Sequence, residues 1–186
     1  MFRPIVAVLA LSAVLATACG ATDAGDVEPA AYAHSVCSGL IGWRDGVAAD
    51  SAALSHSLSG AADVATVRSR YGAFFTATVR RTDELIGTVK SAGAPKADHG
   101  LGYSRDLTAA LGKARAGLAA ARKSFAALPT GDLAAYAAGA RRIRDSLGTV
   151  FTQVGATLDQ LGGTYTDSGL NRAFRADPAC QRLSGS

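Results

Sequence analysis

Apolar residues recur at helical spacing along most of the chain after about residue 30. In four stretches of about 30 residues, large apolar side chains fall three, four or seven positions apart, which places them on one helical face. The expected helices cover residues 30–58, 63–91, 98–128 and 133–161. The fourth pattern is the most regular, because one apolar row repeats every seven positions and a second accompanies it: Leu133, Ala140, Leu147, Val154 and Leu161, then Tyr136, Ile143 and Val150.

Short breaks separate the four patterns. Gly93-Ala94-Pro95 and Pro129-Thr130-Gly131 are helix stop signals, and Gly162-Gly163 follows the fourth pattern. Pro29 suits a first helical turn, and Thr130 or Asp132 can cap the fourth helix. The sequence therefore predicts an all-α fold, an antiparallel four-helix bundle followed by a short C-terminal helix at about 168–176. Aromatic residues make up only 6% of the chain, which also favours close-packed helices over strands.

Aromatic side chains and glycines within these helices leave two interpretations open. The aromatics are at core spacing and are expected in the core, with the lining of a lipid pocket as the alternative. They are Trp43, Tyr71, Phe74, Phe75, Phe125, Tyr136 and Phe151. Each helix glycine lowers helix stability by up to about 1 kcal/mol relative to alanine. Either close helix crossing or a groove lined by bare backbone explains these glycines, among them Gly42, Gly46, Gly72, Gly87, Gly112, Gly117, Gly139, Gly148 and Gly155.

Residues 1–18 have the features of an export signal. Arg3 precedes the apolar run Ile5–Leu15, and the small residues Ala16-Thr17-Ala18 follow directly before Cys19. A membrane-spanning helix needs about 20 apolar residues, so this run is too short for a permanent anchor. Ala16–Cys19 resembles the lipobox of bacterial lipoproteins, in which the cysteine is diacylglycerol-modified on sulfur and becomes the mature N-terminus. Leucine is commoner at the position of Ala16, and ordinary secretory cleavage after Ala18 is the alternative.

The expected organisation follows from this signal. We expect residues 1–18 to be a lipoprotein signal peptide. Residues 19–29 are expected to be a flexible tether, because this segment consists of small and acidic residues without apolar periodicity. Residues 30–186 are then the helical domain. The domain is expected on the extracytoplasmic face of the cell membrane, with the lipid membrane as its partner through acylated Cys19.

Cys37 and Cys180 remain when Cys19 is lipidated, and an exported domain sits where thiols can oxidise. A disulfide between them closes a loop of over a hundred residues, for which the chain-entropy model gives about 5 kcal/mol. Antiparallel threading brings the end of the fourth helix beside the start of the first, so this disulfide and the bundle topology predict each other. Two separate buried thiols are the alternative.

Four stretches of the chain resemble a family of uncharacterised secreted proteins and lipoproteins of actinobacteria. They are Val36–Trp43, Thr82–Ile86, Ala127–Asp132 and Leu170–Cys180. The resemblance implies a helical extracytoplasmic domain with joined ends. It implies no activity and no functional residue.

Candidate catalytic and metal-binding groups are few. His34 and Cys37 lie one helical turn apart, but the disulfide uses Cys37, so we expect no metal and no cofactor. His56 is expected to be solvated near a helix end. Asp83-Glu84 is the one acidic doublet, and neighbours on a helix point apart, so it is a poor catalytic dyad. Ser35, Ser38 and Ser55 lie near histidines without a nucleophile elbow, and no catalytic residue or enzymatic activity is expected.

The mature chain is only mildly basic. The whole chain carries a net charge of +4, and removal of Arg3 with the leader leaves +3. Dense basic stripes with interleaved aromatics are absent from the sequence, so no nucleic-acid binding is expected. Arg80-Arg81 and Arg141-Arg142-x-Arg144 are expected to be surface groups, with contact to lipid phosphates or an anionic envelope polymer as the alternative.

These observations together predict a non-enzymatic envelope lipoprotein that binds or spaces another envelope component, such as a protein or an anionic polymer. The alternative is a carrier or sensor whose bundle interior holds an apolar small molecule or a lipid.

Overall fold

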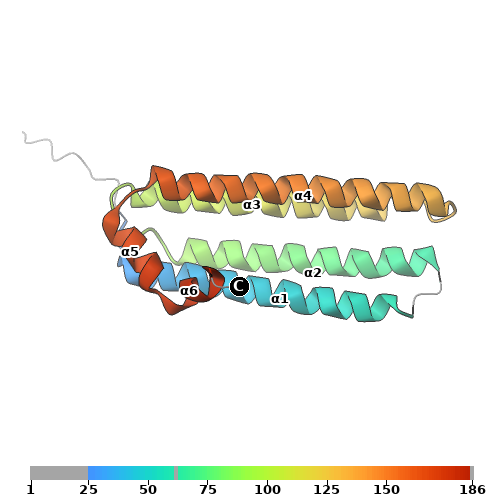
Figure 1. Cartoon of the computed structure of the whole chain (residues 1–186), viewed down its shortest axis with the longest axis horizontal. Helices are drawn as coiled ribbons and strands as arrows, with labels where there is room; N and C mark the ends of the chain where they lie inside the picture. Colours follow the sequence, from blue (N-terminus) through green and yellow to red (C-terminus); the bar gives the residue numbers. More distant parts are fainter. Residues whose placement is uncertain (1–24, 61–62, 185–186) are drawn as a thin grey trace, which may run out of the picture.

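The computed structural model describes residues 25–60 and 63–184. Four long helices in this part of the chain run antiparallel in sequence order, and two short helices follow them (Figure 1). The long helices are α1 (Pro29–Leu58), α2 (Val64–Ser91), α3 (Gly100–Ala126) and α4 (Leu133–Thr164). The short ones are α5 (Ser168–Ala176) and α6 (Pro178–Ser184). The expected all-α bundle is confirmed, and the predicted C-terminal helix is followed by a second one.

Local sequence signals account for several helix ends, but the expected stop at Gly162-Gly163 is wrong, because α4 continues through both glycines to Thr164. The Asp63 side chain accepts a hydrogen bond from the Thr66 backbone N–H at 2.7 Å and caps α2. Of the two candidate caps for α4, Asp132 is the one used, since it accepts from the Ala135 N–H at 2.9 Å. Gly93, with φ of 77°, takes the left-handed conformation that follows the end of α2.

The helices pack in sequence order, so that α1 packs on α2, α2 on α3 and α3 on α4, while α5 and α6 pack on α1. In Figure 1 the α2–α3 turn and α5 lie at one end of the bundle, and the α3–α4 turn lies at the other. We call these the α5 end and the far end. In the described part of the chain, α1 and α4 do not pack against each other along their length.

The core at the α5 end draws on α1 to α5. Its buried members include Tyr32 and Val36 of α1, Leu161 of α4 and Leu170 of α5. The Tyr32 ring lies 6.0 Å from that of Tyr103 and 6.3 Å from that of Phe174, both in edge-to-face geometry. The two ends of the domain therefore share one core.

The disulfide between Cys37 and Cys180 is present, with Cα atoms 5.0 Å apart, and joins α1 to α6. Asp177 supports this junction, because its carboxylate accepts from the backbone N–H groups of Ala179 and Cys180 and lies 3.0 Å from His34 Nδ1. The predicted linkage of the domain ends is confirmed.

The core at the far end contains no member from α1 among the described residues. Its buried residues lie on α2, on α3 and the turn after it, and on α4: Phe75, Ala121, Phe125, Leu128, Tyr136 and Ile143. The partly buried side chains packed against them come from α2 and α4. The bundle is thus closed by α1 at the α5 end and left without α1 in its core at the far end.

Residues 25–28, which we expected to belong to the flexible tether, are paired with the α2–α3 turn. The Gly25 N–H donates to the Pro95 carbonyl at 3.0 Å, and the Val27 N–H donates to the Ala94 carbonyl at 3.1 Å. The Lys96 N–H donates in turn to the Val27 carbonyl at 2.6 Å. The chain therefore enters the domain at the α5 end. Residues 1–24, with the predicted signal peptide and Cys19, lie outside the described residues.

Three large apolar residues within the expected helices are exposed, although the apolar spacing predicts that they face the core. Leu101 and Leu133 lie in the first turns of α3 and α4 and are 51% and 69% exposed. Phe151, expected in the core, is 40% exposed on α4. The heptad pattern marks an apolar helix face but not whether a neighbouring helix covers all of it.

The helix glycines fall into two groups, and the expected close crossing of helices accounts for one of them. A side chain at Gly117 would meet Val150 of α4, and one at Gly46 would meet the guanidinium of Arg81, so these glycines allow close approach between helices. No atom lies within 4 Å of the Cβ position at Gly72, Gly87, Gly112, Gly148 or Gly155. Close crossing explains the first group only, and nothing in the structure explains the second.

Candidate functional site

An apolar groove at the far end of the bundle is the strongest candidate site. It lies between α2 and α4, with α3 as its floor, and has a volume of about 490 Å³, within the range of small-molecule pockets. No acidic residue is among the described residues that line it. The lining consists of Val67, Tyr71, Phe74, Phe75, Phe125, Tyr136, Ala140, Arg141, Ile143, Arg144 and Leu147.

The groove wall is a connected group of aromatic rings. The Phe125 ring centroid lies 4.8 Å from that of Tyr71 and 5.8 Å from those of both Phe75 and Tyr136. Phe74 and Phe75 lie 5.7 Å apart in edge-to-face geometry. Such contacts add to the stabilisation from burial and hold the rings in place. The groove therefore has a preformed apolar surface.

Polar contacts hold α1 against α2 beside this groove. Arg81 of α2 donates to both carboxylate oxygens of Asp50 of α1, at 2.6 and 3.0 Å. This pair lowers the pKa of Asp50, chiefly through the hydrogen bond from Arg81. Gly46 leaves the space that the Arg81 side chain needs. Because these contacts face α2, the last turns of α1 lie along α2 and do not enter the aromatic core.

Tyr136 lines the groove and carries a buried polar atom without a partner. The residue is 7% exposed, and its hydroxyl is buried with no hydrogen-bond partner among the described residues. Leaving a buried hydroxyl unpaired costs about 1–3 kcal/mol. Burial and the nearby Tyr71 raise the pKa of Tyr136, while the charge of Arg68 opposes the shift. The hydroxyl is thus protonated at neutral pH and free to donate.

Arg141 and Arg144 form the rim of the groove on α4. They lie one helical turn apart, and both are exposed. Arg141 makes no ion pair within residues 25–60 and 63–184, and Arg144 pairs with its exposed neighbour Asp145 at 3.0 Å. The rim is therefore positively charged above an apolar interior.

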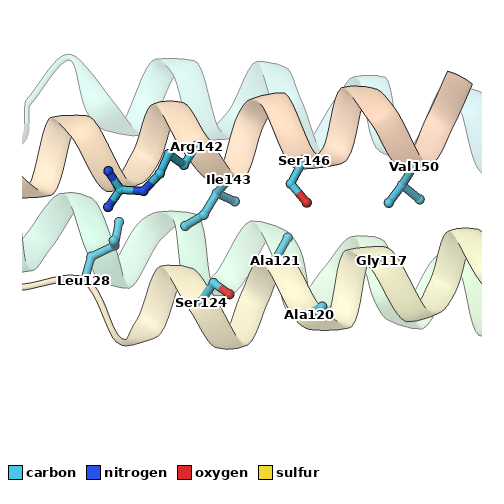
Figure 2. Close-up of a pocket in the computed structure, with 10 residues that line it drawn as sticks. Gly117, Ala120, Ala121, Ser124, Leu128, Arg142, Ile143, Ser146 and Val150 are labelled. Atoms are coloured by element: carbon cyan, nitrogen blue, oxygen red, sulfur yellow. The ribbon is translucent and has the colours of Figure 1, made fainter.

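A second hollow lies on the outer face of the α3–α4 pair and has a volume of about 370 Å³. Figure 2 shows the α3 residues that line it, Ala120, Ala121 and Ser124, facing Ser146 and Val150 of α4. Arg142 belongs to this hollow and not to the groove. Ile143 lies between the two sites and lines both.

The residues that the sequence singled out for possible chemistry lie in structural roles. His34 is paired with Asp177, and its distance of one turn from Cys37 does not make a metal site because both cysteines are in the disulfide. Asp177 and the two sulfurs lie within 4.8 Å of one another, but disulfide sulfurs are not thiolate ligands. His56 is exposed in the last turn of α1.

The acidic doublet and the basic pair of α2 form ion pairs. Asp83 accepts two hydrogen bonds from Arg115 of α3, at 2.7 and 3.1 Å. Glu84 pairs with Arg80 one turn away on the same helix, and Arg81 pairs with Asp50. Arg80 and Glu84 lie on the surface as expected, whereas the Arg81–Asp50 and Arg115–Asp83 pairs join neighbouring helices, which the sequence did not predict.

The groove itself was only partly predicted. For all the aromatic residues that line the groove, the sequence analysis gave the lining of a lipid pocket as the alternative to a place in the core. It did not show that the site opens between α2 and α4. The signal that pointed toward it was the density of aromatics at 71–75 together with Phe125 and Tyr136. The sequence analysis identified Arg141 and Arg144 as part of a basic cluster, but it did not place them at a groove.

No described helix combines the length and the apolar character that crossing a membrane requires. Comparison of the chain with protein-family models, with curated proteins and with solved structures gives no match. The resemblance to secreted proteins of actinobacteria stays a prediction.

Proposed function

We propose that this chain is a lipid-anchored extracytoplasmic protein that binds an apolar molecule in the groove between α2 and α4 and is not an enzyme. The observation that carries the proposal is the aromatic groove left open because α1 is absent from the far-end core. Its rings are already in mutual contact, so a ligand gains apolar contacts without first ordering the wall.

A ligand retained from the native host tests the proposal directly. The Cys19→Ser variant, which lacks the expected acylation site, is purified from its own host without detergent, and its intact mass is measured by native mass spectrometry. The expected result is an added mass that denaturation releases. An empty protein that also fails to bind apolar dyes in solution contradicts the proposal.

A substitution that fills the groove tests the location. Ala140 lines the groove and is half-buried, so Ala140→Phe places a ring in the space that the ligand needs. Binding of the neutral dye N-phenyl-1-naphthylamine is expected to weaken at least about tenfold, equivalent to about 1.4 kcal/mol. Ala120→Phe, which places the same ring in the outer hollow, is the matched control. Equal binding by both variants places the ligand elsewhere.

The anchor is tested separately. If Cys19 carries the lipid, the Cys19→Ser protein leaves the membrane fraction and appears in the soluble one. Membrane association that survives this substitution contradicts the lipid anchor but leaves the groove unaffected.

A second candidate function is binding of another envelope component, a protein or an anionic polymer. The exposed apolar side chains Phe151 and Leu158 favour a protein, because they lie seven positions apart on α4 and so share a face. Crosslinking in the native envelope, with Phe151→Ser/Leu158→Ser as the comparison, tests it. A partner captured by both proteins contradicts a docking role for this face.

A further inference from the structure

We propose that the ligand of the groove is an amphiphile whose head group is an anion, a carboxylate or a phosphate, bound by Arg141 and Arg144. This inference rests on the proposed function of the groove and names the class of molecule that the groove takes. It depends on where the charges of the described residues lie around the apolar lining.

The groove presents positive charge without a compensating acid in its wall. Arg141 and Arg144 are the charged residues that line it, and none of the lining residues is acidic. A guanidinium binds carboxylate and phosphate through charge-assisted, often bidentate hydrogen bonds. The two arginines therefore attract an anion at the rim and repel a cationic head group.

Both guanidinium groups are available to a ligand. Arg141 has no ion pair in the described part of the chain. Arg144 pairs with Asp145 at 3.0 Å, but the two side chains are 74% and 66% exposed. Exposed pairs of this kind contribute about 0–1 kcal/mol, so a ligand anion replaces Asp145 at little cost.

The arrangement of α4 separates the rim from the interior. Arg141 and Arg144 are exposed, whereas Tyr136 and Ile143 on the same helix are buried against the aromatic cluster. A molecule that extends from the rim into the groove thus meets charge at one end and rings at the other. A single-chain amphiphile with an anionic head matches that order.

Arg142 supplies a matched control. It lies between the two rim arginines in sequence and is exposed like them, but it lines the outer hollow (Figure 2). Arg142→Gln therefore removes one positive charge, as each rim substitution does, from the same stretch of helix without changing the groove. Any effect that net charge alone produces appears in this variant as well.

The experiment compares ligands of equal chain length in displacing N-phenyl-1-naphthylamine from the Cys19→Ser protein. Dodecanoate and dodecyl phosphate are expected to displace the dye at about tenfold lower concentration than dodecanol, because only they bind the guanidinium groups. Arg141→Gln/Arg144→Gln should remove this preference, so that all three ligands displace the dye at similar concentrations. Arg142→Gln should keep the preference. Circular dichroism that matches that of the unchanged protein shows that the double variant is folded.

Free anions test whether the groove binds the head group only as part of an amphiphile or also as a free carboxylate or phosphate. Acetate and inorganic phosphate, at the concentrations at which the amphiphiles act, are expected not to displace the dye. Displacement by them overturns the requirement for an apolar chain.

Three further results separate this inference from the function on which it rests. Equal displacement by dodecanoate and dodecanol overturns the anionic head group and leaves an apolar groove intact. A preference lost in Arg142→Gln as much as in the double variant also overturns it, because the effect is then one of net charge. Failure of the protein to bind the neutral dye at all contradicts the proposed function itself.

Discussion

Replacing Cys37 and Cys180 together by alanine measures how much the joined ends stabilise the domain. The disulfide links positions separated by 143 residues, and for a loop of that length the chain-entropy relation gives about 5 kcal/mol. Single domains have total stabilities of about 5–15 kcal/mol, so the expected loss is a large share of the whole. It acts mainly through the unfolded chain, which becomes less constrained.

The folded structure of the double variant should change little. α5 and α6 keep other contacts with α1, since Leu170 and Ala179 are both 2% exposed and His34 remains beside Asp177. The groove lies at the far end of the bundle. Helical content and binding of N-phenyl-1-naphthylamine are therefore expected to match those of the unchanged protein.

The assay is urea unfolding followed by circular dichroism. The double variant should unfold at lower urea concentration, and its transition should be steeper because the uncrosslinked chain exposes more surface. The unchanged protein under reducing conditions is the control, and it should unfold like the variant. A loss below about 1 kcal/mol would refute the reasoning, because the closed loop would then contribute almost nothing.

Further predictions concern backbone space, backbone conformation and pH. Gly148→Ala should raise the free energy of unfolding by up to about 1 kcal/mol, since nothing lies within 4 Å of its Cβ position. Gly117→Ala should lower it, because the new methyl group meets Val150, and thermal melting of the two variants would show opposite shifts. His99 has a φ of 58°, so His99→Gly should stabilise the domain by about 0.5 kcal/mol in the same assay; a lower melting temperature would contradict the strain. The Arg115 hydrogen bonds lower the pKa of Asp83 below its unfolded value. The contribution of the Asp83–Arg115 pair to the free energy of unfolding is therefore present above about pH 4, and it is lost as the pH falls through the pKa of Asp83 in the folded protein. Urea unfolding at a series of acidic pH values should show this decline, and Arg115→Gln should reduce it; equal pH profiles for the two proteins would contradict the assignment.

Helix positions and the disulfide could be predicted from the sequence because both depend on local or countable features. Asp132 marks a helix end through its capping hydrogen bond, Pro29 through its fixed φ, and Gly93 because the lack of a Cβ allows a positive φ. The cysteine count and the antiparallel order together gave the pairing of Cys37 with Cys180.

The open groove could not be predicted, because periodicity shows that a helix face is apolar without showing which helix covers it. Val47, Leu54 and Leu58 of α1 follow the expected spacing but are only half-buried. The Asp50–Arg81 pair joins residues of two helices with no fixed sequence separation, and it holds this part of α1 on α2. The position of α1, and with it the groove, is a property of the packed helices.

The hydrogen bonds of Gly25 and Val27 to the α2–α3 turn fix the end of the domain from which the chain leads back to Cys19, the proposed anchor. Residues 71–91 of α2 separate the two ends by about 30 Å, at about 1.5 Å per residue. Residues 19–24 can extend at most about 20 Å beyond the domain. If Cys19 is in the bilayer and the groove binds the proposed ligand, the domain is a short arm whose binding site lies at the end away from the membrane anchor.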